Sequence, residues 1–393
     1  MQHIGQTSEA PLALEIVKAA GCKLFDVNGK EYIDLIGGIS VCNVGHRHPK
    51  VIEAIKKQLD DYLHIMVYGE LVQSPQVQYA TKLTAHLPAS LNSVFFTASG
   101  SEATEGAMKL AKRFSGRTQI ISFKNSYHGS TQGALSIMGD EYWRNAFRPL
   151  LPDTLQLKYN SFEDLENITP RTACVIAETV QAEAGVIVPQ NNWLQALRKK
   201  CDTTGTLLVL DEIQCGFGRN GSLWAFEQFD VVQDILLLGK ALGGGMPLGA
   251  FIADKKIMDS LSHNPVLGHI NTFGGHPVCC VAGLAAFKVL LEEKLIDGVK
   301  EKEALFVELL NKGSDDSKLS RPLTIRSCGL MITIAFDNFE MNKKIIDALI
   351  ADGIFTDWFL FASNCLRIVP PLVISNEEIK IACEKIIAAV KTC

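Results

Sequence analysis

Apolar runs of strand length alternate with helical patterns from about residue 90 to residue 255, and this alternation constrains the fold more than any other feature. The runs are rich in apolar residues, as buried strands are, and lie at 93–96, 119–123, 173–177, 206–210 and 235–238. Between them, apolar residues recur at helical spacing, for example Ala107, Leu110 and Ala111. This pattern predicts an α/β fold, with a mostly parallel sheet sandwiched between helices.

The pattern changes beyond about residue 295. A charged helical stretch at 300–310 leads into a polar loop, and strand-like runs near 324–326 and 331–335 precede a helical pattern at 341–351. Near the other end of the chain, Asn28 and Gly29 separate two short runs in the manner of a hairpin turn. We therefore expect a second, smaller domain of α+β type after a boundary near residues 290–300.

Composition limits the classes of function. The chain has 393 residues, 47% of them apolar, and a formal net charge of −5 without a basic stripe, which argues against nucleic acid as a partner. The first ten residues are polar, unlike a signal peptide, and no apolar run approaches the ~20 residues of a membrane span. Eleven cysteines without a Cys-x-x-Cys pair indicate reduced thiols in a cytoplasmic protein.

Two strand-like runs end in residues that can do chemistry. The run at 206–210 ends at Asp211, and the run at 235–238 ends at Lys240, just before the glycines at 243–245. The carboxyl ends of parallel strands share one edge of a sheet, so the acid and the amine should face one crevice. A lysine in this position is more often a surface residue, but a desolvated lysine has a lowered pKa and becomes nucleophilic.

A strand, a Gly/Ser turn and a helix follow one another around Gly100 and Ser101. This arrangement can present backbone N–H groups to a phosphate, or it can be an ordinary helix start capped by Ser101, and the sequence favours neither. Tyr127 and His128 follow another predicted strand, where the aromatic ring could stack on a flat cofactor or simply be half buried in a loop.

Acids and histidines elsewhere have ordinary explanations as well. Glu178 and Glu183 follow the run at 173–177, and such acids are usually solvated or paired. His46 and His48 have a spacing that makes a metal pair unlikely, and capping or packing is the better interpretation. We expect no metal site.

Taken together, the motifs resemble the class III (ornithine/acetylornithine/ω-amino acid) aminotransferases, pyridoxal 5′-phosphate enzymes of fold type I. The resemblance runs nearly end to end, from Gly-Gly at 37–38 and Asn-Val-Gly-His-Arg-His-Pro at 43–49 to Arg-Ile-Val-Pro-Pro-Leu at 367–372. Its core is Leu-Asp-Glu-Ile-Gln-Cys-Gly-Phe-Gly-Arg at 210–219 with Gly-Lys-Ala-Leu-Gly-Gly-Gly at 239–245. Several motifs in the family's order make a chance match implausible.

The resemblance implies residue roles. Lys240 matches the lysine that forms a Schiff base with the cofactor, Asp211 the acid paired with the pyridinium nitrogen, and Gln214 the residue near the phenolic oxygen. The remaining cofactor-binding positions are Gly100 and Ser101 for the phosphate, Tyr127 and His128 for the ring, Glu178, and Thr272. The threonine in the family reaches the phosphate of the neighbouring subunit, which implies a homodimer with shared active sites.

For the substrate, Glu183 and Arg367 resemble a paired switch in which the arginine takes a carboxylate and the glutamate covers it otherwise. Ser130 stands where many acetylornithine and ornithine enzymes have an arginine, which weakens the prediction of acetylornithine as donor. The pocket wall is expected to include Tyr68 and Ile39, and we add Val41 and Trp143 as further candidates.

The implied fold has a large domain at 51–295, a small domain at 296–393, and an N-terminal segment at 1–50 that joins the small domain. The implied activity moves an amino group from an amino acid, with a terminal amine such as that of acetylornithine, ornithine or another ω-amino acid, to a keto acid such as 2-oxoglutarate or pyruvate. Two alternatives stay open: a decarboxylase or aminomutase of the same fold, and a non-catalytic cofactor-binding protein.

Overall fold

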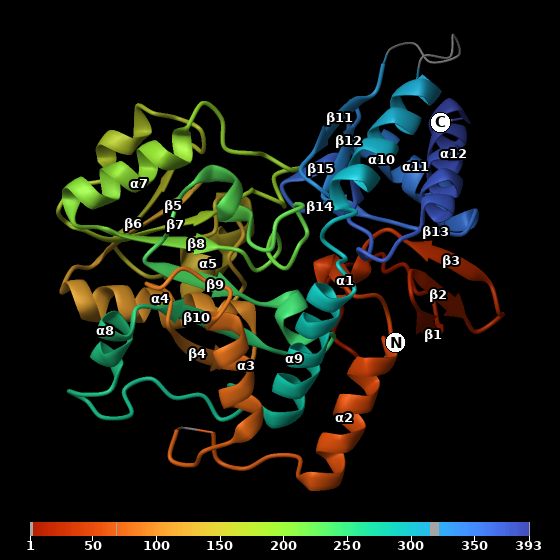
Figure 1. The fold of residues 1–393 in the computed structure, drawn as a ribbon. Coiled ribbons are helices and arrows are strands. Elements are labelled where there is room, and N and C mark those ends of the chain that lie inside the picture. The colour runs from red at the N-terminus through yellow and green to blue at the C-terminus, as the bar shows by residue number, and fades with distance from the viewer. Residues whose placement is uncertain (1–2, 68, 315–321, 393) are drawn as a thin grey trace.

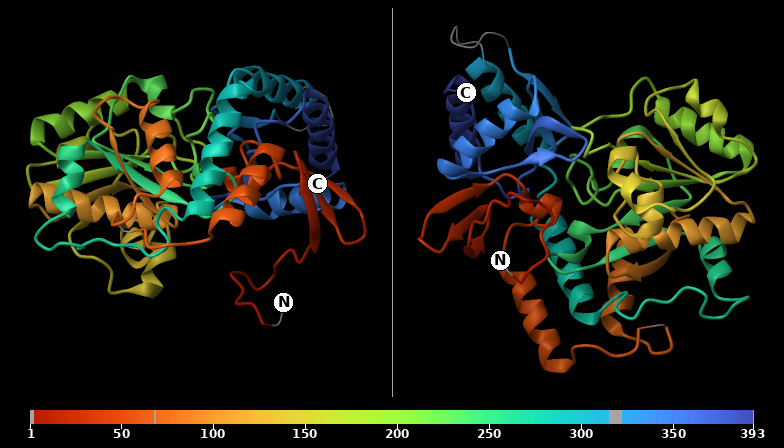
Figure 2. Two further views of the ribbon diagram at one scale, coloured as in Figure 1. Left: turned by 60° about the horizontal axis from the view of Figure 1, so that its bottom comes forward. Right: turned by 180° about the vertical axis from the view of Figure 1, so that it is seen from behind.

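The computed structural model describes residues 3–67, 69–314 and 322–392. Figure 1 shows a large sheet covered by helices, and beside it a smaller part in which the two ends of the chain, coloured red and blue, lie together. The views in Figure 2 show the same two parts from other sides. No helix within the described ranges has both the length and the apolar character that a membrane span needs.

The largest sheet carries the candidate site. Its strands lie in the order β4 (Ser93–Thr97), β10 (Gly249–Ala253), β9 (Ile235–Leu238), β8 (Leu207–Asp211), β7 (Thr172–Glu178), β5 (Gln119–Phe123) and β6 (Thr154–Leu157). The pairs from β9 to β6 are parallel, whereas β10 runs antiparallel to both of its neighbours. The prediction of a mostly parallel sheet is confirmed. The antiparallel direction of β10 was not predicted from the sequence.

Helices cover both faces of this sheet. Successive side chains of a strand point to opposite faces, and in this sheet both sets are apolar and must be shielded from water. In β7, Cys174 and Ile176 pack in one core cluster with residues of α4 (Gly100–Ser115). Val175 and Ala177 lie in the other cluster with residues of α7 (Trp193–Thr204). The strand is apolar throughout since neither face meets water.

The smaller part combines both chain ends. One four-stranded sheet has the order β11 (Thr324–Ser327), β12 (Ile332–Ala335), β15 (Ala362–Ile368) and β14 (Trp358–Phe359). The other has the order β1 (Ile16–Ala20), β2 (Lys23–Asp26), β3 (Glu31–Asp34) and β13 (Ile354–Phe355). Because β3 and β13 pair directly, the N-terminal segment shares a sheet with the C-terminal region. The exact domain boundaries stay a prediction.

Helices complete both parts. The smaller part includes α10 (Val299–Ser314), α11 (Phe339–Ala351) and α12 (Asn376–Thr392). The others are α2 (Pro49–Asp61), α3 (Ser74–Thr84), α5 (Gln132–Ser136), α6 (Glu141–Arg144), α8 (Lys255–Met258) and α9 (Pro277–Glu292).

The segment that contains Ile39 forms α1 (Gly37–Ser40), a single tight turn in which all four residues have positive φ. One strand differs from the sequence-based expectation. The strand expected to end in both Glu178 and Glu183 ends at Glu178, so Glu183 lies in the following loop. His46 pairs with an acid, because Asp34 Oδ2 lies 2.6 Å from its Nε2. Within the described ranges, no group of three or more His, Cys, Asp or Glu residues is arranged to hold a metal.

Candidate active site

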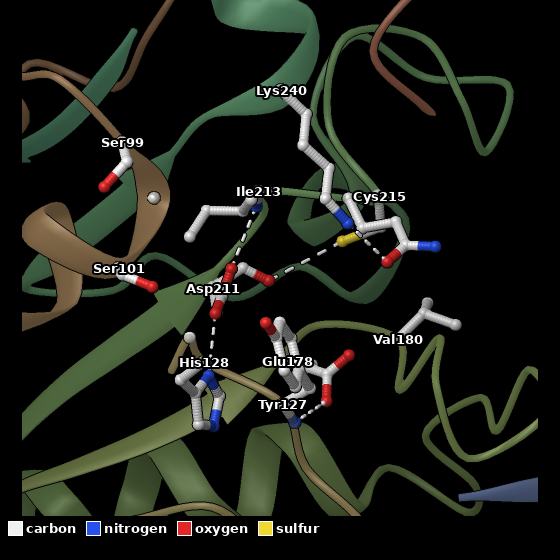
Figure 3. A pocket seen from close by; sticks show the side chains of 13 residues that line it. Ser99, Ser101, Tyr127, His128, Glu178, Val180, Asp211, Ile213, Cys215 and Lys240 are labelled. Carbon is white, nitrogen blue, oxygen red and sulfur yellow. Dashed lines mark hydrogen bonds and ion pairs between the residues drawn. The ribbon is translucent and has the colours of Figure 1, made fainter. Parts of the chain in front are cut away.

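The carboxyl ends of three parallel strands form the floor of a cavity. Glu178 at the end of β7 pairs in register with Asp211 at the end of β8, and Asp211 pairs with Leu237 of β9. Lys240 follows two residues after β9. The cavity, of about 200 Å³, is shown from close by in Figure 3. The predicted residues that line it are Gly100, Ser101, Tyr127, His128, Glu178, Asp211, Gln214 and Lys240.

Lys240 supplies the amine. Its Nζ donates to Gln214 Oε1 at 2.7 Å. Burial lowers the pKa of Lys240, although the charges of Glu183 and Asp211 act to raise it. A larger fraction of the amine is therefore neutral at a given pH. The backbone of Lys240 has φ of 48°, in the left-handed region that is unfavourable for a residue with a side chain. Such strain is typical of residues that a site holds in one orientation.

Asp211 supplies a carboxylate that its neighbours fix in place. Its Oδ2 lies 2.7 Å from His128 Nδ1, and its Oδ1 accepts a hydrogen bond from the Ile213 backbone at 2.9 Å. Figure 3 shows both contacts as dashed lines. The side chain is only 4% exposed. A buried carboxylate held in this way favours positive charge on a partner within the cavity.

Glu178 is a second buried acid beside Asp211. Its two carboxyl oxygens each accept a backbone hydrogen bond at 3.0 Å, one from Tyr127 and one from Ala182. Burial raises the pKa of Glu178 to about 7, and the charge of Asp211 adds to this although His128 and the two N–H groups oppose it. Because it accepts from the Tyr127 N–H, the Glu178 carboxyl group fixes the backbone of the segment that carries Tyr127.

The start of α4 borders the cavity. Ser99 caps this helix, since its side chain accepts from the backbone N–H of Glu102 at 3.2 Å. The alternative in which Ser101 is the cap is therefore wrong, and Ser101 Oγ instead accepts from the Ser130 backbone at 3.1 Å. A side chain at position 100 would place its Cβ 2.9 Å from Ile213 Cδ1, so Gly100 lets Ile213 pack closely against the start of the helix. The unpaired N–H groups of this first turn suit an anion.

Glu183 and Arg367 form a buried ion pair. Arg367 Nη1 and Nη2 donate to the two carboxyl oxygens of Glu183, each at 2.9 Å. The two side chains are 4% and 8% exposed, for the arginine and the glutamate respectively. Burial alone would raise the pKa of Glu183, but the charges of Arg367 and Lys240 outweigh it and hold the pKa below its ordinary value. The pair is close enough to Lys240 for their charges to interact.

Other predicted residues lie outside this cavity lining. Ser130 is exposed, with its Oγ 3.2 Å from Tyr127 Oη. Thr272 is exposed in the loop before α9. Ile39 is 36% exposed and is not among the residues that line this cavity, so its place in the wall of the substrate pocket stays a prediction. Tyr68 lies outside the described residues.

The two further wall candidates also lie elsewhere. Val41 borders a separate small cavity with Phe217 and Ala241. The ring centroid of Trp143 lies 6.4 Å from that of Phe361, whose backbone N–H donates to the Glu183 carbonyl at 3.0 Å. Trp143 is therefore adjacent to the loop that carries Glu183.

Sequence reasoning missed five residues that line the cavity: Ser99, Gly129, Val180, Ile213 and Cys215. A signal existed for Ser99, because Ser followed by Glu three residues later is a helix-start pattern. Ile213 and Cys215 flank the predicted Gln214, so their position in the motif was a signal as well. Nothing in the sequence indicated the acid that contacts Arg367, Asp357.

Comparisons with known proteins agree with the geometry. A family model described as aminotransferase class-III matches residues 4–390. The acetylornithine aminotransferase of Methanopyrus kandleri is 37% identical over 392 residues, which cover 99% of this chain and 97% of that protein. The acetylornithine aminotransferase of Methanosarcina acetivorans is 38% identical over 383 residues, covering 96% and 92%.

Solved structures give the same result. The ornithine aminotransferase of Toxoplasma gondii superposes with a TM-score of 0.90 at 29% identity, covering 99% of this chain and 92% of that one. The acetylornithine aminotransferase of Elizabethkingia anophelis superposes with a TM-score of 0.85 at 30% identity, covering 100% and 97%. Since the family model spans nearly the whole chain and close relatives match it end to end, the chain belongs to the class III aminotransferases, enzymes of fold type I that depend on pyridoxal phosphate.

Proposed function

We propose that this aminotransferase takes the amino group from the terminal amine of an amino acid and gives it to a keto acid such as 2-oxoglutarate or pyruvate. Acetylornithine, ornithine and other ω-amino acids are the donors considered. The observation that carries the proposal is the buried pair of Glu183 and Arg367, whose charges act on Lys240. A site that must receive a carboxylate in one half-reaction and avoid one in the other needs a cation that can be covered.

The cavity fits pyridoxal phosphate. The start of α4, at Gly100 and Ser101, suits the phosphate, because its N–H groups and helix dipole favour an anion. The Nε2 group of Gln214 is buried in this structure without a hydrogen-bond partner, which suits a polar group on the cofactor ring. Asp211 and Lys240 both line the same cavity. We assign the cofactor to these residues, together with Tyr127, His128 and Glu178.

When bound, the cofactor supplies an electron sink that stabilises negative charge on the carbon carrying the amino group. Asp211 would hold the proton on the ring nitrogen, and His128 orients Asp211 through their 2.7 Å contact. The Nζ of Lys240, whose pKa burial lowers, would accept the proton from the amine-bearing carbon of the donor and deliver it to the cofactor side. Lys240 and Asp211 are therefore the proposed catalytic residues.

Glu183 and Arg367 would select substrates in turn. With Glu183 in place, the arginine is neutralised, so a donor presents its terminal amine and keeps its α-carboxylate away. When Glu183 withdraws, Arg367 can take the α-carboxylate of the keto acid in a two-point contact. The relatives named acetylornithine aminotransferase support a terminal-amine donor, whereas the exposed Ser130 offers no charge to the carboxylate of the donor.

We further propose a homodimer in which Thr272 reaches the phosphate in the partner's site. Thr272 is exposed and lies between apolar residues that are also exposed, Ile270 at 49% and Phe273 at 55%. The loop before α3 lies against this segment, since the ring centroids of His64 and Phe273 are 5.2 Å apart, and it exposes Leu71 and Val72 at 47% and 91%. Exposed apolar residues that gather in this way mark protein interfaces. The cysteines of the described ranges are free thiols, which fits the reducing cytoplasm that we propose as the location.

A donor panel tests the proposal. The purified holoenzyme is offered N-acetylornithine, ornithine, lysine, 4-aminobutyrate and β-alanine, each with 2-oxoglutarate or pyruvate. We expect turnover with at least one terminal-amine donor, and a large loss of keto-acid use in Arg367→Ala. Release of carbon dioxide, or failure of the amine-loaded enzyme to pass its amino group to any keto acid, would instead indicate a decarboxylase or aminomutase.

The role of Ser130 is tested separately in the same panel. Ser130→Arg adds a cation beside Tyr127 at an exposed position. We expect the variant to lower the KM for N-acetylornithine relative to ornithine, because the added cation attracts the carboxylate of both donors but repels the α-ammonium that only ornithine carries. If the order of donors does not change, position 130 does not select the donor.

A further inference from the structure

Arg367 has contacts that do not depend on Glu183. Besides its two bonds to that glutamate, Nη2 donates to the Trp358 carbonyl at 2.7 Å. Its Cζ lies 4.6 Å from the ring centroid of Phe359, within the range of a cation–π contact. Its Nε forms an ion pair with Asp357 Oδ1 at 2.9 Å, and the two atoms are not aligned for a hydrogen bond. These three contacts come from consecutive residues, 357–359, so one short segment surrounds the guanidinium on the sides that Glu183 leaves free.

The same segment fixes the backbone of Arg367. The Arg367 N–H donates to the Asp357 carbonyl at 3.0 Å, and its carbonyl accepts from the Thr356 hydroxyl at 2.6 Å. Glu183 lies in the loop beyond β7, where the Leu360 N–H donates to its Oε2 at 2.9 Å. Withdrawal of Glu183 would therefore break its bonds to Arg367 and Leu360, while every other contact of the arginine stays.

The charge balance explains why a second acid is needed. A buried guanidinium without a counter-ion is strongly unfavourable, because the interior solvates it poorly. Arg367 is 4% exposed, so the moment at which Glu183 has left and no substrate carboxylate has arrived would otherwise leave it uncompensated. Asp357, whose side chain is 35% exposed, stays in contact throughout. Burial raises the pKa of Asp357 to about 6, and the charge of Arg367 opposes this rise. The charge of Glu183 adds to the rise, so withdrawal of Glu183 favours the ionised form of Asp357.

We propose that Asp357 is a positioning residue of the transamination reaction: it holds the Nε edge of Arg367 and serves as its permanent counter-ion while Glu183 exchanges with the carboxylate of the keto acid. This inference rests on the proposed receiving role of Arg367. It goes further by assigning to Asp357 a function that is specific to acceptors with a carboxylate.

The test compares two acceptors in Asp357→Ala holoenzyme that a donor has first loaded with an amino group. Pyruvate carries the carboxylate, and acetaldehyde has the same carbonyl end without it. We expect kcat/KM for pyruvate to fall about tenfold, the loss typical of one charge-assisted contact, while the value for acetaldehyde and the rate of the donor half-reaction change less than twofold. Asp357→Asn, which keeps the size of the side chain and removes its charge, should show the same selective loss.

Asp352→Ala is the matched control, because this nearby acid pairs with Lys385 and does not contact Arg367. Equal losses for both acceptors in the Asp357 variants, no loss, or a gain for pyruvate would each overturn the inference. A gain would mean that the charge of Asp357 only repels the substrate. Arg367→Ala, measured in parallel, distinguishes failure of the inference about Asp357 from failure of the proposed role of Arg367. If Arg367→Ala lowers kcat/KM equally for pyruvate and acetaldehyde, Arg367 does not receive the carboxylate of the keto acid.

Discussion

Substitution of Glu183 by Gln would change the choice between donors more than any other single replacement in the site. The amide keeps the shape of the side chain and loses its charge. One of its two terminal groups becomes an N–H donor that faces a donor of Arg367, so at most one of the two 2.9 Å bonds persists. Arg367 would then be open to a carboxylate during both half-reactions.

The magnitude follows from the geometry. Breaking a buried ion pair by removing one partner costs about 3–5 kcal/mol, because the other charge is left uncompensated. Asp357 keeps its contact with Arg367, and a glutamine retains one hydrogen bond. We therefore expect the substitution to change the relative binding free energy of the two donors by about 2 kcal/mol. That free energy corresponds to a factor of about thirty in relative affinity.

Stopped-flow absorbance of the cofactor measures the donor half-reaction with ornithine and with glutamate. In Glu183→Gln, the ratio of kcat/KM for ornithine to kcat/KM for glutamate should fall about thirtyfold, because the uncovered arginine accepts the α-carboxylate of glutamate. Glu166→Gln is a control, since this exposed acid forms a surface pair with Lys200. An unchanged ratio would refute the idea that Glu183 covers Arg367.

Three further predictions concern other parts of the molecule. Asp211→Asn should still bind the cofactor but lower turnover by roughly 10²–10³, measured as steady-state kcat, because a neutral amide cannot hold a proton on the ring nitrogen. Burial lowers the pKa of His46, but Asp34 and Cys42 together raise it to about 10. The contacts of His46 therefore stabilise the fold fully below pH 6.5 and progressively less toward pH 10. Asp34→Asn should therefore flatten the fall in free energy of unfolding over this range, by at most about 1.4 kcal/mol per pH unit in denaturant titrations, and parallel slopes would contradict this. Phe273→Glu should convert the proposed dimer to monomers in size-exclusion chromatography and reduce activity with it, and an active monomer would show that the sites are not shared.

The convergence of Asp211 and Lys240 could be predicted from sequence for a physical reason. Parallel strands with apolar side chains on both faces are recognisable as continuous apolar runs, and their carboxyl ends must share one edge. Residues that directly follow such runs therefore come together, whatever lies between them in the chain. Glu178 lies beside Asp211 for the same physical reason, although the pairing of these two acids was not predicted from the sequence.

Contacts between distant segments were harder to predict. Glu183 and Arg367 lie 184 positions apart, and only the family resemblance brought them together. The contact of Asp357 with Arg367 depends on the turn between β14 and β15, which has no distinctive sequence pattern. Ser99 rather than Ser101 caps α4 because the helix already begins at Gly100, so Ser101 lies in its first turn. The orientation of β10 follows from pairing on both sides, which local sequence does not encode.

Reduction of the holoenzyme with borohydride, followed by mass mapping of its peptides, tests most directly whether Lys240 holds pyridoxal phosphate. The account predicts that the mass of the reduced cofactor appears on the peptide that contains Lys240, and that Lys240→Ala carries no such mass. A cofactor fixed on a different lysine, or no covalent attachment in the wild-type enzyme, would contradict the placement of the amine of Lys240 and the carboxylate of Asp211 around one ring.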